Sequence, residues 1–253
     1  MVFIDINCNK KKDMELIKII YKKIISYLKS SDVIYPKPLE IKQTDKILIL
    51  APHADDESIG CGGLLLKYAK QCEIICVTNC KTGNPSVDPE EAIIERYNEF
   101  KEAMNFLGAK YHFNKDIDSD NLKNSYKLFE KLLNKYDLST FNYIALPIWY
   151  DQHCDHKALN ILFKKYLKKN NINLNCKILI YEVWSAIAVP NKFIDLTDIL
   201  DKKKQLIGFH KSQINVIDYR EKIQGLNIYR GMIVNKKAAE VYLEFNIKEF
   251  KEL

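Results

Sequence analysis

The chain has 253 residues, of which 47% are hydrophobic and 28% are charged, and its formal net charge is +6 at pH 7. This length supports one domain with a sizeable core, and the composition is typical of globular rather than disordered or fibrous chains. No apolar run approaches the ~20 residues that span a bilayer, which argues against a membrane span. The lysines are scattered over amphipathic segments without interleaved aromatic residues, so they predict solvated helix faces and no nucleic-acid partner.

The first forty residues have the pattern of a helical extension. Apolar side chains recur at helical spacing from Asp13 to Lys29, and the Tyr35-Pro36-Lys37-Pro38 turn ends the helix. The start of the chain lacks the order of basic region, apolar core and cleavage site of a signal peptide, so we expect a cytoplasmic protein. We predict an N-terminal helical extension over residues 1–40 and a single domain over residues 41–253.

Strand and helix patterns alternate from residue 46 onward. The expected strands are 46–51, 73–78, 110–113, 142–147 and 177–182, and the expected helices are 60–70, 89–107, 122–136, 155–169 and 200–211. This alternation predicts an α/β fold, a Rossmann-like and mostly parallel sheet with helices on both faces. Gly60-Cys61-Gly62-Gly63 lacks the full dinucleotide fingerprint, and its glycines predict close packing of a helix on the sheet.

The most informative motif, His53-Ala54-Asp55-Asp56-Glu57, ends the first of these strands. Ligands of open α/β sheets bind at the carboxyl ends of strands, and several carboxylates gathered there are costly to desolvate without a cation. A histidine and an aspartate three residues later can bind one divalent ion, while the aspartate between them stays free as a base. Helix capping accounts for Ser58 or Glu57, but not for the histidine and two adjacent aspartates.

A second polar run, Asp151-Gln152-His153-Cys154-Asp155-His156, follows the strand expected at 142–147. Because parallel strands end at the same edge of a sheet, a histidine of this run can converge with His53 and Asp56. Three protein ligands leave one position for water, which is the arrangement of catalytic rather than structural zinc. The sequence therefore predicts a catalytic metal site built from two distant segments.

The chain has seven cysteines, an odd number, and most of them lie in apolar surroundings. Buried free thiols are the expected state of such residues. Cys76 and Cys80 are not followed by the second pair that a zinc knuckle requires, and we expect Cys154 to pack away from the metal.

The ordered motifs resemble the zinc-dependent N-acetylglucosamine deacetylase family, also called the PIG-L or LmbE-like family. The first signature of that family is His-Pro-Asp-Asp-Glu, and in this chain Ala54 replaces the proline. The second signature is Asp-x-His-x-Asp-His, which the run from Asp151 to His156 matches. Further family features follow in order, namely Arg96-Tyr97-Asn98-Glu99, Leu107-Gly108, Tyr181-Glu182-Val183-Trp184, His210-Lys211-Ser212-Gln213 and Glu244-Phe245. The resemblance extends over roughly residues 44–247.

The resemblance implies a Zn²⁺ cofactor, with other divalent ions possible, and assigns the metal ligands to His53, Asp56 and His156. It makes Asp55 the general base. The implied reaction removes the acetyl group from an N-acetylglucosaminyl-type amino sugar by means of a zinc-activated water. The protein is then a hydrolase of carbon–nitrogen bonds whose partner is a small amino sugar.

The same resemblance implies roles for four further residues. His153 is expected to polarise the substrate carbonyl, and Asp155 is expected to hold that imidazole and favour its charged form. Arg96 and Asp151 are expected to contact the substrate.

Two other functions stay open at this point. A metal-dependent phosphohydrolase also uses clustered aspartates and histidines, although two-metal sites generally require more bridging carboxylates. A non-catalytic sugar-binding or regulatory module of the same fold has no need of Asp55, His153 and Asp155. The sequence leaves the identity of the substrate and the oligomeric state undetermined.

Overall fold

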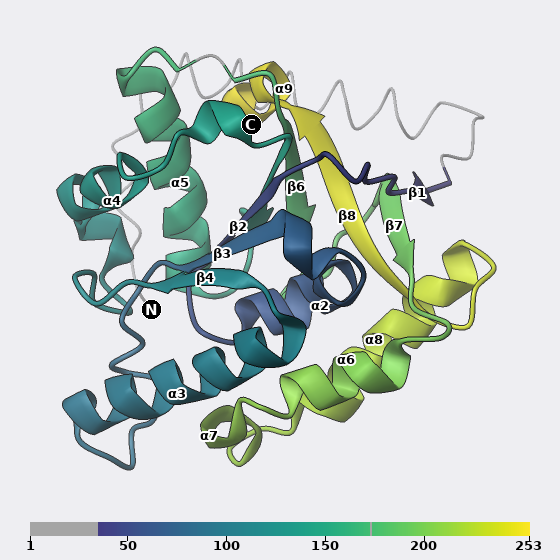
Figure 1. Cartoon of the computed structure of the whole chain (residues 1–253), viewed down its shortest axis with the longest axis horizontal. Helices are drawn as coiled ribbons and strands as arrows, with labels where there is room; N and C mark the ends of the chain where they lie inside the picture. Colours follow the sequence, from purple (N-terminus) through teal and green to yellow (C-terminus); the bar gives the residue numbers. More distant parts are fainter. Residues whose placement is uncertain (1–34, 173) are drawn as a thin grey trace, which may run out of the picture. The chain divides into compact units, whose positions relative to one another are not determined.

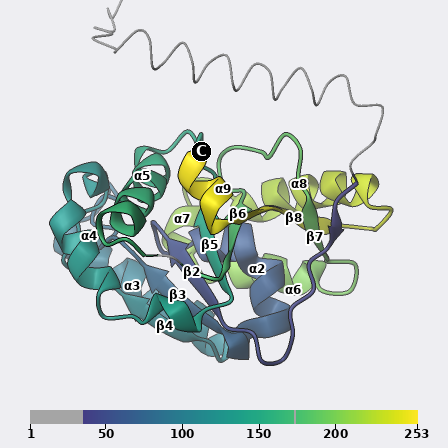
Figure 2. The same cartoon turned by 90° about the horizontal axis from the view of Figure 1, so that it is seen from above.

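A computed structural model of the chain describes residues 35–172 and 174–253. The helix expected over Asp13–Lys29, and with it most of the proposed extension, lies outside the described residues. Tyr35–Leu253 form one compact unit, shown in two orientations in Figures 1 and 2. Among the helices of the described part, none has the length and apolar character needed to cross a bilayer.

The described residues form a sheet of eight strands in the order β1-β7-β8-β6-β5-β2-β3-β4 (Figure 1). Its parallel part consists of β2 (Ile47–Ala51), β3 (Cys72–Cys76), β4 (Lys110–Phe113), β5 (Tyr143–Pro147) and β6 (Lys177–Tyr181). These strands lie where the sequence predicts them. The α/β fold with a mostly parallel sheet is therefore confirmed.

Three further strands extend the sheet beyond β6 and were not predicted. β8 (Ala239–Asn246) runs antiparallel to both β6 and β7 (Lys192–Asp195). β1 (Lys37–Pro38) pairs in parallel with β7 at the edge. The sheet is thus mixed, with one antiparallel strand inserted between two groups of parallel strands.

Helices cover both faces of the sheet (Figure 1). The bounds of the helices are α2 (Asp56–Tyr68), α3 (Pro89–Leu107), α4 (Tyr126–Leu133), α5 (Cys154–Lys169), α6 (Leu200–Ile207), α7 (Lys211–Ile214), α8 (Tyr219–Ile233) and α9 (Ile247–Glu252), with short 3₁₀ turns at Ala69–Gln71, Leu122–Asn124 and Leu138–Thr140. Alternation along β2 divides the core: Leu48 and Leu50 pack with α4, α5 and α9, whereas Ile47 and Ile49 pack with α2, α3 and α6.

Three of the expected helices differ from the structure by several residues. The helix predicted over 122–136 is limited to α4 (Tyr126–Leu133), which follows the 3₁₀ turn Leu122–Asn124. The helix predicted from residue 60 begins at Asp56, so that Asp56 and Glu57 lie in the first turn of α2. The helix predicted over 200–211 ends at Ile207, and the separate short helix α7 follows. The earlier start of α2 matters for function, because it holds the side chains of Asp56 and Glu57 close to the end of β2.

The position of the site follows from the sheet order. β2 and β5 are direct neighbours, with Ile47 opposite Tyr143 in the register. Both strands run in the same direction, and α2 and α5 begin shortly after them. The two polar runs predicted to converge therefore leave adjacent strands at the same edge of the sheet.

Candidate metal and catalytic site

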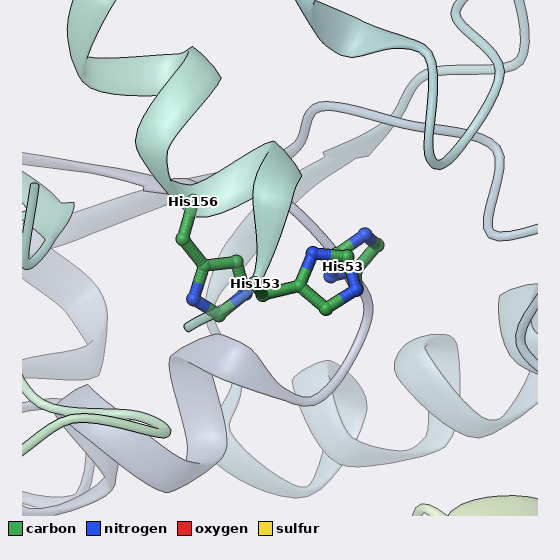
Figure 3. A group of neighbouring side chains, drawn as sticks. All are labelled: His53, His153 and His156. Atoms are coloured by element: carbon green, nitrogen blue, oxygen red, sulfur yellow. The ribbon is translucent and has the colours of Figure 1, made fainter. Parts of the chain in front are cut away.

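His53, Asp56 and His156 bring three potential metal-binding atoms together. Oδ2 of Asp56 lies 3.3 Å from Nδ1 of His53 and 3.2 Å from Nε2 of His156. Ligand atoms at 2.0–2.1 Å from a tetrahedral zinc ion are separated by about 3.3 Å, so these spacings fit a bound cation. Figure 3 shows the His53 and His156 rings with His153 beside them, and one nitrogen from each of the three rings can be chosen within 4.8 Å of the others.

The imidazole of His156 provides an independent indication that these residues fit a cation. Its side chain is fully buried, and neither ring nitrogen makes a hydrogen bond of good geometry with any described residue. Buried polar atoms are seldom left unpaired in native proteins. Burial by itself would lower the pKa of His156, but the nearby carboxylates of Asp56 and Asp151 outweigh it and raise the pKa to about 9. Surroundings that stabilise a proton on this ring also suit a divalent cation.

Asp151 lies behind His156 rather than in the substrate space. Its Oδ1 is 3.4 Å from Nδ1 of His156, and its other oxygen accepts hydrogen bonds from the backbone N–H groups of Trp184 and Ser185 at 3.0 and 3.1 Å. The side chain is fully buried and does not line the cavity. The prediction that Asp151 contacts the substrate is therefore wrong; a carboxylate in this position orients a metal-ligating histidine.

Asp155 contacts a different histidine from the one expected. Its Oδ2 lies 3.0 Å from Nε2 of His53, and its carboxylate also accepts hydrogen bonds from the backbone N–H groups of Asp120 and Leu122. The expectation that this carboxylate holds His153 is corrected by that geometry. Only the backbone N–H of Asp155 reaches His153, donating to Nδ1 at 3.2 Å.

His153 caps the N-terminus of α5 and is half-buried. Because Nδ1 accepts a hydrogen bond, Nε2 is the nitrogen that carries the proton in the neutral ring. Burial, together with the neighbouring imidazoles of His53 and His156, lowers the pKa of His153. The direction of this shift is opposite to the one expected from the sequence.

Asp55 is separate from the three clustered ligands and pairs with a buried arginine. Its Oδ1 lies 3.2 Å from Nη2 of Arg96, which also donates to the backbone carbonyl of Ala54. Burial raises the pKa of Asp55, and the charge of Arg96 opposes that rise. Nε and Nη1 of Arg96 have no hydrogen-bond partner among the described residues, although the guanidinium borders the cavity.

A cavity of about 190 Å³ joins these groups. His53, Asp55, Asp56 and His153 line it together with Arg96, as the sequence predicts for a common site. The sequence reasoning missed Cys80, Ser119, Asp120 and Tyr219 as lining residues. Of these, Ser119 and Asp120 follow the strand predicted at 110–113. Their position after the carboxyl end of a parallel strand was the one sequence feature that could have placed them at the site.

The later family features act as supports around the cavity. Nε2 of His210 lies 3.0 Å from Oγ of Ser58, and that hydroxyl donates to Glu57 at 2.7 Å. Glu99 accepts hydrogen bonds from both the backbone N–H and the hydroxyl of Ser212. These contacts join α7 to α2 and α3 beneath the site.

Residues 48–167 match the protein family described as PIG-L, GlcNAc-PI de-N-acetylase. The matched segment contains both polar runs and Arg96. Over that segment the chain is similar to the PIG-L family. The diacetylchitobiose deacetylase of Thermococcus kodakarensis is 24% identical to it over 186 residues, which are 66% of this chain and 70% of that protein.

Solved structures of deacetylases share the fold. The N,N'-diacetylchitobiose deacetylase from Pyrococcus horikoshii superposes with a TM-score of 0.67 at 19% identity, covering 96% of this chain and 95% of that one. A zinc-inhibited form of teicoplanin deacetylase superposes with a TM-score of 0.60 at 13% identity, covering 79% and 97%. At these identities the structural likeness establishes the fold, and the chemistry has to be argued from the site.

Proposed function

We propose that this chain, whose residues 48–167 match the PIG-L family, is a metal-dependent hydrolase that removes the acetyl group from an N-acetyl amino sugar. The observation that carries the proposal is the position of Asp55, a carboxylate that lines the same cavity as His53 and Asp56 but is separate from the clustered atoms of His53, Asp56 and His156. The similarity to the PIG-L family and to a deacetylase supports this chemistry.

The proposed ligands of the cofactor are His53, Asp56 and His156. Two imidazoles and one carboxylate suit zinc, and other divalent ions accept the same donors. When bound, the ion supplies Lewis-acid activation of a water and of the substrate carbonyl. Asp151 and Asp155 support the outer nitrogens of His156 and His53 respectively.

The remaining steps are assigned to side chains that face the cavity. Asp55 is the proposed base that takes a proton from the attacking water, and its raised pKa makes it a better proton acceptor than an ordinary aspartate. The Nε2–H of His153 is the proposed donor to the carbonyl oxygen as negative charge develops there. The two unpaired nitrogens of Arg96 are the proposed contacts to the sugar hydroxyls.

The rim of the cavity is compatible with a sugar ring. Trp184 and Tyr219 both line the cavity, and their rings meet edge to face with centroids 5.4 Å apart. Aromatic rings of this kind provide an apolar wall beside polar groups that bind hydroxyls. The diacetylchitobiose deacetylases among the relatives suggest N,N'-diacetylchitobiose as the first probe.

The competing functions have less support. The two groups of potential metal ligands found among the described residues share His153, so they do not offer the two independent positions of a two-metal phosphohydrolase. A non-catalytic module has no requirement for a buried base on the cavity. Both alternatives nevertheless give distinct experimental results.

The proposal is tested by measuring acetate release from N,N'-diacetylchitobiose and from N-acetylglucosamine. We expect activity that disappears after dialysis against a chelator and returns on addition of Zn²⁺ or another divalent ion. Hydrolysis of p-nitrophenyl phosphate without acetate release would favour the phosphohydrolase. Sugar binding without any turnover, in protein with one metal ion per chain, would favour the non-catalytic module.

A further inference from the structure

Cys76 and Cys80 bring two thiols into contact at the wall of the catalytic cavity. Cys76 is the last residue of β3, Cys80 lies in the loop that follows, and their Sγ atoms are 3.7 Å apart. Both residues have reduced, free thiols and are buried, but only Cys80 lines the cavity. One sulfur therefore borders the substrate space, and the second lies directly beside it.

The backbone between the two cysteines is fixed. Three successive N–H groups of this segment, those of Val77, Thr78 and Asn79, donate to backbone carbonyls at 2.8–3.1 Å, and two of the acceptors precede His53 directly. Cys80 itself has a positive φ of 58°, a conformation that costs a non-glycine residue of order 1 kcal/mol or more. Such conformations persist where the surrounding structure holds them in place, and here the result is that the two sulfurs face each other.

We propose that Cys80 and Cys76 form a dithiol site that reduces small disulfides entering the catalytic cavity and closes a Cys76–Cys80 disulfide in return. The Cys80 sulfur attacks one sulfur of the entering molecule RSSR, which forms a Cys80–S–SR bond and releases RSH. The Cys76 sulfur then attacks the Cys80 sulfur and releases the second RSH. Two electrons pass from the cysteine pair to RSSR, and the two thiol protons leave on the two RSH molecules.

Closure of this bond alters the wall of the catalytic site. A disulfide requires a sulfur–sulfur distance of about 2.05 Å, so one or both sulfurs must move from their present 3.7 Å separation. The backbone N–H of Ala54, between His53 and Asp55, donates to the Cys80 sulfur at 3.4 Å. Movement of that sulfur therefore disturbs the turn that carries the proposed ligand and base. We expect oxidation to lower deacetylation and reduction to restore it, a consequence that rests on the proposed function.

The test uses the reduced full-length protein and cystamine, a small aminoethyl disulfide. After reaction the protein is unfolded, labelled with N-ethylmaleimide and digested with trypsin, which releases residues 71–81 as one peptide containing Cys72, Cys76 and Cys80. We expect this peptide to carry two labels fewer than in untreated protein, with its one label on Cys72. Fragment ions from cleavage between residues 76 and 80 should appear only after reduction.

Single substitutions separate the two sulfurs. Cys76→Ser should trap Cys80 as a mixed disulfide with the aminoethylthio group, because the second attacking sulfur is gone. Cys80→Ser should leave Cys76 unmodified, because the entering sulfur is gone. The exposed Cys154 provides an internal control for the reagent in every sample.

Full labelling of all three cysteines in wild-type peptide 71–81, at a time when Cys154 has reacted completely, would overturn the proposal. A bond that joins Cys72 to either partner would overturn it as well. The peptide result is independent of enzymatic activity, so a protein that fails to deacetylate any probe still gives a clear answer about the dithiol.

Discussion

The carboxylate of Asp155 lies 3.0 Å from Nε2 of His53, the ring nitrogen opposite the one that faces Asp56. An outer-shell carboxylate fixes the orientation of a metal-ligating imidazole and raises its basicity, and its loss typically lowers metal affinity 10–100-fold. We therefore expect Asp155→Asn to raise the Kd for zinc by about 10–100-fold, measured by competition with a chelating dye.

The matched control for this change is Asp116→Asn, which neutralises an exposed aspartate that takes no part in the site. Its Kd for zinc should equal that of the wild type. If Asp155→Asn keeps wild-type metal affinity and loses only turnover, the carboxylate acts on His153 instead of His53.

Asp55→Asn should separate the base from the ligands. The carboxamide cannot take a proton, so acetate release should fall by roughly 10²-fold or more. Metal content, measured by elemental analysis, should stay at the wild-type level because Asp55 is not among the proposed ligands. His53→Ala and His156→Ala should instead lose the metal, and equal metal loss in all three variants would show that Asp55 is itself a ligand.

The buried Arg96–Asp55 pair should show strong coupling in stability. Nη2 of Arg96 lies 3.2 Å from Asp55, and the arginine is 2% exposed. Arg96→Met leaves a buried carboxylate uncompensated, which should lower the free energy of unfolding by about 3–5 kcal/mol. Adding Asp55→Asn removes that charge, so the double variant should be more stable than the sum of the single changes predicts, by about 0.5–3 kcal/mol in urea denaturation. Strict additivity would contradict an energetically significant pair.

Two glycines offer a matched comparison of packing and backbone effects. A Cβ at Gly60 would collide with the Tyr181 ring and lie 2.7 Å from the Glu182 carbonyl oxygen, whereas a Cβ at Gly225 in α8 meets nothing within 4 Å. Gly60→Ala should destabilise the protein by about 1–3 kcal/mol or more. Gly225→Ala should stabilise it by about 0.5–1 kcal/mol, since alanine favours a helix interior. Thermal unfolding of both variants checks the opposite signs.

The parallel strands β2, β3, β5 and β6 were predictable because each is a short, mostly apolar and mostly buried run. β8 was not, because its sequence interrupts the apolar pattern with Glu240 and Glu244. Glu240 is buried by a partner that local sequence does not disclose: the Lys203 ammonium lies 2.6 Å away, and the backbone N–H groups of Gly63 and Leu64 donate to the carboxylate. Because the ion pair joins distant segments, the hydrophobic pattern of residues 239–246 alone does not predict that Glu240 is buried in a strand.

The composition of the site was predictable to a greater extent than its contacts. Spacing and strand direction brought His53, Asp56 and His156 together, because neighbouring parallel strands end at one edge. The partners of Asp151 and Asp155 were assigned wrongly in the sequence analysis. Which carboxylate lies behind which imidazole depends on side-chain directions in the first turn of α5 and in the loop before it, and residue spacing does not fix these directions.

The position of β8 in the sheet has a consequence for the order in which the chain assembles. β7 and β1 join the rest of the sheet only through β8, which the ribosome makes after both of them. During synthesis the strands β2 to β6 can pair as they emerge, whereas β1 and β7 have no neighbour in that group. β1 and β7 can pair with each other, but the edge of β7 that faces β8 stays unpaired until residues 239–246 are available, the kind of exposed edge that favours aggregation. A chain released before residue 239 would contain both polar runs of the site but would lack β8, the strand that joins β7 to β6.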